Sequence, residues 1–161
     1  SIMLLKEKPY RPRMADYRIG VFFTGREQLG EGAKTTAPVY YANRWDIQPS
    51  DTAAYLRGEK VKPTKQIVFY IDNTFPEKWK PYLREGVTQW NELFEQIGFK
   101  DVVAAKDFPT DDPEFDPDNI KYSCVRYAPS SIENAMGPSW VDPRSGEILN
   151  ASVYLLSLIH I

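Results

Sequence analysis

The chain has 161 residues, 42% of them hydrophobic and 14% aromatic, so it is long and apolar enough to bury a core. Lys and Arg number 20 against 22 Asp and Glu, and no basic stripe interleaved with aromatics occurs, so nucleic acid is not expected as a partner. No apolar stretch approaches the ~20 residues that cross a bilayer, so no transmembrane segment is expected. Cys124 is the only cysteine, which excludes an intrachain disulfide and a cysteine-based zinc cluster.

Residues 1–65 are expected to form a β-rich region that precedes the main fold. The β-branched and aromatic run Tyr17–Thr24 predicts a strand, and the stretch 25–36, with its glycines and lysine, predicts a loop. A second strand is expected over Val39–Ile47. The linker that follows contains prolines and a glycine, and it is expected to hold a short helical turn near residues 52–57.

The clearest strand signal is Ile67–Ile71, which is apolar on both alternating faces. Such a pattern is typical of a central strand that is covered on both sides. A helix is predicted next, because apolar residues recur at three- and four-residue steps and form one stripe that must face a sheet. The stripe consists of Trp79, Leu83, Val87, Trp90, Phe94 and Ile97.

The ends of this helix also carry signals. Thr74 and Glu77 have the spacing of a capping box, and Gly98 is placed for a left-handed stop at the carboxyl end. Pro81 lacks the amide hydrogen that an interior position donates. It therefore predicts either a kink or a separate opening turn, with the regular helix starting near Pro81.

Further strands are predicted over 99–106, Ile120–Tyr127 and Ile148–Tyr154. The first should pair in parallel with the strand before the helix, as a right-handed βαβ unit. The acidic, proline-rich stretch 107–119 predicts a loop, and Asp142–Gly146 predicts a turn. The expected fold class is α+β, with a twisted, mixed, mostly parallel sheet and a backing helix.

The residues that hydrolytic chemistry needs are scarce. A hydrolytic zinc site takes about three protein ligands, commonly two histidines one helical turn apart, yet His160 is the only histidine. No His-Glu-x-x-His or Gly-x-Ser-x-Gly motif is present, so a serine triad is equally unsupported. Cys124 falls in the middle of a predicted strand, where a buried structural thiol is expected rather than a nucleophile. The chain by itself is expected to be catalytically inert.

The acidic loop leaves two alternatives open. Its carboxylates could wrap a calcium ion, or they could simply form a solvated charged loop. The spacing does not match an EF-hand, because the central glycine is missing. The carboxylates belong to Asp107, Asp111, Asp112, Glu114, Asp116 and Asp118.

An ordered series of segments carries a family resemblance. It comprises Ile67–Ile71, Trp79–Phe99 ending in Gln-Ile-Gly-Phe, Ile120–Pro129 ending in Arg-Tyr-Ala-Pro, and Ser130–Leu149. Met14–Phe23 and Asn43–Trp45 look like the region that precedes the core in the same proteins. Together these segments resemble large bacterial extracytoplasmic zinc metallopeptidases with a metzincin-like core.

The resemblance implies an organisation for the chain. Residues 1–65 would precede the peptidase core, and residues 66–154 would form the N-terminal, upper subdomain of a truncated catalytic domain. Zinc would be the cofactor of the full-length parent, bound by a later helix with a His-Glu-x-x-His motif that this chain does not contain. Residues 155–161 depart from the family and resemble translated sequencing-adapter read-through, so His160 is not expected to be a ligand. An extracytoplasmic location follows from the resemblance alone.

In metzincins a peptide or protein substrate pairs with an antiparallel strand at the edge of the sheet. The resemblance assigns this edge to Asn134, Ala135, Met136, Gly137, Pro138, Ser139 and Trp140. Gly137 fits because it lets another backbone come close, and Pro138 fits an edge because a central strand would miss its amide. The alternative is a plain β-hairpin with Asp142–Gly146 as its turn and Trp140 as a packing residue.

Two further functions stay open. A non-enzymatic surface module could use the 10 tyrosines and 4 tryptophans to bind carbohydrate or protein. Burial of Trp79 and Trp90 beneath the sheet would remove the main support for it. An inhibitory or chaperoning pro-segment in the first third of the chain is the other possibility, without a zinc-capping cysteine to support it.

Overall fold

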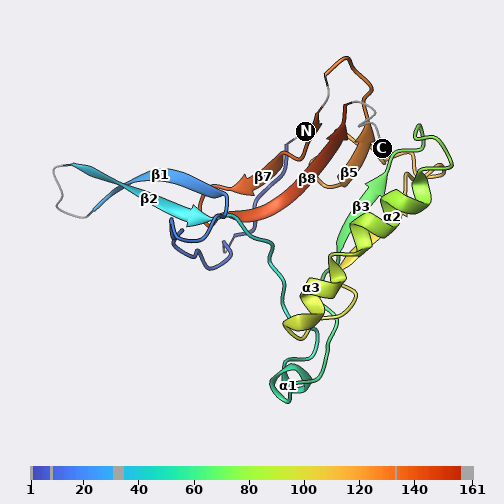
Figure 1. The fold of residues 1–161 in the computed structure, drawn as a ribbon. Coiled ribbons are helices and arrows are strands. Elements are labelled where there is room, and N and C mark those ends of the chain that lie inside the picture. The colour runs from blue at the N-terminus through green and yellow to red at the C-terminus, as the bar shows by residue number, and fades with distance from the viewer. Residues whose placement is uncertain (1, 8, 31–34, 133, 157–161) are drawn as a thin grey trace. The chain divides into compact units, whose positions relative to one another are not determined.

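The computed structural model describes residues 2–7, 9–30, 35–132 and 134–156 (Figure 1). It is a mixed α+β structure with a mostly parallel sheet and few helices. The chain divides into two compact units, one holding residues 47–138 and the segment from 151 onward, the other holding 2–46 and 139–150. Residues 47–65 thus belong to the unit of the parallel sheet.

The main sheet has the strand order β4-β3-β5-β8-β6, with β7 paired to β8 outside this path. Its strands are β3 (Ile67–Ile71), β4 (Val103–Asp107), β5 (Ser123–Tyr127), β6 (Ala135–Met136), β7 (Ser139–Asp142) and β8 (Glu147–Leu155). β3 runs parallel to β4 and β5, β5 runs parallel to β8, and β6 alone is antiparallel to β8 along this path. β3 is an interior strand of the sheet, and its parallel pairing with β4 confirms the predicted strand–helix–strand connection.

One face of the sheet packs against helix α2 (Lys80–Thr88). Ile71, Phe75 and Val125 form the buried cluster, against which the α2 side chains Leu83 and Val87 pack. The regular helix begins at Lys80 with Pro81 in its first turn, where the missing amide hydrogen is not needed. The predicted start near Pro81 is therefore confirmed.

The continuous apolar stripe predicted beyond α2 is wrong in its second half. The helix is interrupted after Thr88, α3 covers only Asn91–Gln96, and Trp90 and Ile97 are 60% and 57% exposed. The carboxamide of Asn91 both donates to Val103 O (2.9 Å) and accepts from Val103 N (2.8 Å). This side chain fixes the start of α3 to the edge strand β4, and it leaves the Trp90 side chain in solvent.

The predicted capping box is also wrong. The Thr74 amide and hydroxyl both donate to Asp72 Oδ1, at 2.9 and 2.8 Å, and the Glu77 carboxylate accepts from Lys80 Nζ. Because these groups form local turns before the helix starts, neither caps it.

Other local signals are confirmed. Helix α1 (Thr52–Leu56) lies where a helical turn was predicted, and the Asp51 carboxylate accepts from the Ala54 amide at its N-terminus. Gly98 ends the helical segment with φ at +88°. The strands β4 and β5 begin later than predicted, at Val103 and Ser123.

In the second unit, β1 (Phe23–Leu29) and β2 (Thr36–Ala42) form an antiparallel hairpin. The predicted strand over Tyr17–Thr24 is wrong except at its last two residues, and the predicted loop over 25–36 is wrong at residues 25–29 and 36, which lie in strands. Residues 31–34 of that loop lie outside the described residues. Arg18 donates to the Asp16 carboxylate from both its backbone and its side chain, and the Ile19 amide donates to Asp16 O. These bonds turn the chain at residues 16–19, so the extended pairing starts only at Phe23.

Candidate functional site: an antiparallel edge strand

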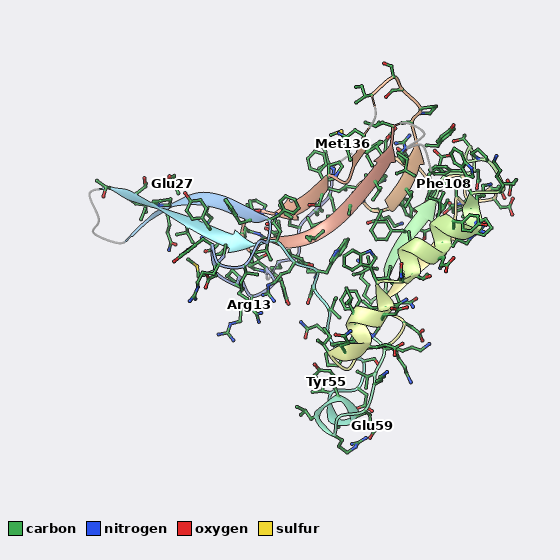
Figure 2. The ribbon with its side chains drawn as sticks, viewed as in Figure 1. Arg13, Glu27, Tyr55, Glu59, Phe108 and Met136 are labelled. Carbon is green, nitrogen blue, oxygen red and sulfur yellow. The ribbon has the colours of Figure 1, made fainter. Side chains whose placement is uncertain are left out.

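The antiparallel strand β6 lies at one end of the strand order, and Met136 marks it in Figure 2. Ala135 pairs with Leu155 and Met136 with Tyr154 of β8. Within the described part of the chain, β6 has no strand on its other side. All seven residues from Asn134 to Trp140, to which the family resemblance assigned the substrate edge, are exposed.

Backbone hydrogen bonds define which groups of this strand are free. Leu156 N donates to Asn134 O (3.2 Å), and Ser152 N donates to Pro138 O (2.9 Å). In an antiparallel pair, residues that bond to the partner strand alternate with residues that do not. Ala135 and Gly137 therefore direct their backbone N–H and C=O groups away from β8, toward the open edge.

A local hydrogen bond further reduces the number of free backbone groups. The Ala135 amide donates to Asn134 Oδ1 at 2.8 Å, which leaves the Ala135 carbonyl and both backbone groups of Gly137 without a bond among the described residues. A Cβ added at Gly137 would meet nothing within 4 Å. The backbone at Gly137 is thus open to close approach, and packing inside the chain does not require glycine there.

Ser139 and Trp140 belong to the second compact unit, as part of β7. β7 and β8 are joined through the turn after Asp142, so the predicted hairpin is present. Trp140 is 63% exposed, however, and is not a packing residue.

The turn of this hairpin is built around a buried carboxylate. Asp142 is 1% exposed and accepts from the Arg144 backbone amide (2.9 Å) and from its guanidinium (2.7 Å). The hydrogen bond from the Arg144 side chain holds the pKa of Asp142 below its ordinary value. The Gly146 amide donates to Asp142 O, and Gly146 has a φ of +74°. This geometry is that of a structural turn.

Asp72, at the carboxyl end of β3, is a buried polar residue that sequence reasoning missed. Besides its two bonds from Thr74, it accepts from the Tyr127 amide on β5 at 3.4 Å. An aspartate directly after a strand and two residues before a threonine is a local turn signal that could have revealed it. Its carboxylate ties the ends of two strands together.

Cys124 is fully buried on β5, as predicted. Burial raises the pKa of its thiol to about 11, because desolvation penalises the thiolate. The thiol is therefore protonated at neutral pH and is not a nucleophile.

The acidic loop folds back on itself. The side chains of Asp112 and Asp116 accept from the amides of Glu114 and Asp118, two residues further along. Arg126 forms an ion pair with Asp118. Its carboxylates thus take part in local turns and in an ion pair.

The part of the chain that the structure describes contains no group of three or more His, Cys, Asp or Glu side chains that could hold a metal ion. His160, like the rest of residues 157–161, lies outside it. None of the helices in this part has the length and apolar character of a bilayer-spanning segment.

These features define a mixed α+β protein in which an antiparallel strand borders a parallel sheet. A family model described as a domain of unknown function (DUF5117) matches residues 1–50, which lie ahead of the main sheet's first strand. No curated protein and no solved structure matches the chain.

Proposed function

We propose that this chain is part of a zinc-dependent metallopeptidase. It supplies the metzincin-like upper subdomain of the catalytic domain and the edge strand along which an extended peptide substrate is aligned. The observation that carries the proposal is the antiparallel strand β6 on a mostly parallel sheet, with free backbone groups at Ala135 and Gly137.

Strand addition explains how this edge recognises a peptide. An extended peptide that lies beside β6 accepts from the Gly137 amide and donates to the carbonyls of Gly137 and Ala135. These bonds involve only main-chain groups, so they orient a substrate without selecting its side chains. Pro138 has no amide hydrogen, but its position faces β8, so it removes no donor from the outward row.

The described residues do not fit a zinc site, and no catalytic step is assigned to them. In this proposal the metal and the general base come from a His-Glu-x-x-His helix in another part of the protein, as the family resemblance implies. The resemblance also supports an extracytoplasmic location.

The continuous natural reading frame tests this proposal first. We expect it to encode a His-Glu-x-x-His helix after the sheet, and we expect the longer protein to bind stoichiometric zinc and to cleave peptides. Removal of zinc with a chelator should abolish cleavage, and added zinc should restore it. A natural protein without such a motif would end the peptidase assignment.

A second candidate is a non-enzymatic binding module, and one observation favours it. Trp90 and Tyr82 are 60% and 73% exposed on the α2–α3 segment, where aromatic rings suit a carbohydrate or a protein partner. Titration with soluble oligosaccharides, followed by tryptophan fluorescence, would test the carbohydrate form of this idea. Saturable quenching that Trp90→Ala removes would support it, and no change in fluorescence would count against it.

A further inference from the structure

The two edges of the β1–β2 hairpin differ in how their backbone groups are used. The β2 edge is occupied, because Ala15 N donates to Tyr40 O (2.8 Å) and Ala42 N donates to Arg13 O (2.9 Å). Further along the same edge stands Pro38, which has no amide hydrogen to offer. This edge is closed to another strand.

The β1 edge is open. Asn43 N donates to Phe22 O (2.8 Å), and the register pairs Thr24 with Tyr41 and Arg26 with Val39. Since bonded and non-bonded pairs alternate, the intervening residues of β1 direct their N–H and C=O groups away from β2. These residues are Phe23, Gly25, Glu27 and Leu29, and no described residue bonds to their backbone.

The protection against pairing that this edge carries is a pair of charged side chains, Arg26 and Glu27. All seven residues of β1 are extended without a proline, and bulges, prolines or covering loops are what natural proteins use to block an edge. An isolated two-stranded hairpin is also marginally stable in water. The row of alternating donors and acceptors is chemically matched only by another polypeptide strand.

The side chains on the two faces of the hairpin indicate which side chains a partner strand should have. One face carries the apolar and aromatic side chains of Phe23, Leu29 and Tyr40, at 58%, 68% and 46% exposed, together with the carboxylate of Glu27. The Phe23 and Tyr40 rings meet edge to face at 5.3 Å. On the other face, the Arg26 guanidinium lies 5.2 Å from the centre of the Tyr41 ring.

We propose that the open edge of β1 receives an extended strand from a partner polypeptide, a strand with apolar side chains on one face and an acidic side chain beside Arg26 on the other. A second copy of this chain fits less well, because antiparallel pairing over the whole of β1 places Arg26 opposite its own copy, and like charges that face each other are destabilising. The proposal concerns the unit of residues 2–46 and is independent of the peptidase function.

The test uses the 161-residue chain and a short synthetic peptide with alternating valine and threonine and a central glutamate on the threonine face. Amide hydrogen exchange by NMR should slow at the outward-facing Gly25 and Glu27 when the peptide is added. It should stay unchanged at Thr24 and Arg26, which already bond to β2. A peptide N-methylated at the amides that face β1 should bind about tenfold more weakly or not at all.

Glu27→Pro provides the matching change in the protein (Figure 2 labels Glu27). Position 27 lies opposite Pro38, a residue that already occupies an outward position in the same hairpin, so the ladder to β2 is retained. Continued protection of the Ala15 amide verifies the fold. Glu27→Pro should weaken peptide binding about tenfold, while Glu27→Ala removes the same carboxylate but keeps the amide.

Several outcomes would overturn the proposal. Equal losses in Glu27→Pro and Glu27→Ala would assign the effect to charge rather than to the edge. If the N-methylated and unmethylated peptides bind equally well, or if exchange does not slow at saturating peptide, strand pairing is ruled out. Concentration-dependent protection of Gly25 and Glu27 without peptide would make a second copy the occupant. If Glu27→Pro unfolds the hairpin, the N-methylated peptide still decides the question.

Discussion

Cys124 lies in the interior of the sheet, where its thiol is shielded from water. The thiol has no exposed surface, and desolvation raises its pKa to about 11. We expect the native chain to resist Ellman's reagent at pH 8 and to react fully after unfolding in guanidinium. Rapid stoichiometric reaction of the native protein would contradict this.

The raised pKa of Cys124 also predicts a dependence of stability on pH. The unfolded thiol ionises near its ordinary pKa of 9.0, whereas the folded thiol stays protonated to about 11. Ionisation therefore favours the unfolded state, and the contribution of this group to stability is complete below pH 9 and is lost as the pH rises toward 11.

The change of stability with pH that Asp142 causes has the opposite sign to that of Cys124. Its folded pKa lies below the ordinary aspartate value of 3.8, so its contribution is present above that value and is lost as the pH falls through the folded pKa. Asp142→Asn should lower the free energy of unfolding at pH 7 by about 1–3 kcal/mol, because it weakens charged hydrogen bonds at a buried site. Urea denaturation measures this. A loss of the same size in Glu85→Gln, which changes an exposed carboxylate, would show that the effect is not local.

The effect of a glycine-to-alanine substitution on stability depends on the backbone conformation at that position. Gly86 lies within α2, and a Cβ there would meet nothing within 4 Å. Gly86→Ala should raise the free energy of unfolding by about 0.5–1 kcal/mol, since alanine restricts the unfolded chain and favours the helix.

Gly98 is expected to show the opposite effect to Gly86 when it is replaced by alanine. Its φ is +88°, and a Cβ would lie 2.9 Å from the Tyr55 ring. Gly98→Ala should lower the free energy of unfolding by about 1–2 kcal/mol or more. Urea denaturation of the two variants side by side should give opposite signs, and two shifts of the same sign would show that these backbone arguments fail.

Among the helices and strands, the features that depend on local residue chemistry were predicted from the sequence. β3 follows from the alternation of its residues, the start of α2 beside Pro81 follows from a missing amide hydrogen, and the stop at Gly98 follows from a left-handed residue. The break after Thr88 was not predictable, because it depends on Asn91 bonding to Val103 across the helix–strand connection. The strand predicted over Tyr17–Thr24 was misplaced because Asp16 and Arg18 form a turn that competes with β propensity. The candidate edge at Asn134–Trp140 came from the family resemblance, since short exposed strands have little periodicity of their own.

In the proposed function, this chain supplies the scaffold and another part of the protein supplies the zinc chemistry. The parallel sheet, its backing helix and the antiparallel strand β6 are present in the described residues, whereas the proposed zinc ligands are not. The 161-residue chain, dialysed after exposure to zinc, should retain much less than one equivalent by elemental analysis and should not cleave peptides. Stoichiometric retention with metal-dependent cleavage would show that the metal site lies within this chain after all.

The most direct measurement of substrate alignment along β6 is kcat/KM for an extended peptide substrate in the longer, zinc-loaded protein with Gly137 substituted. Gly137→Pro removes the outward-facing amide without removing a bond to β8, so we expect a loss of about tenfold or more. Gly137→Ala keeps that amide and should lose much less. Equal kcat/KM for Gly137→Pro and the unsubstituted protein would contradict alignment of the substrate along β6.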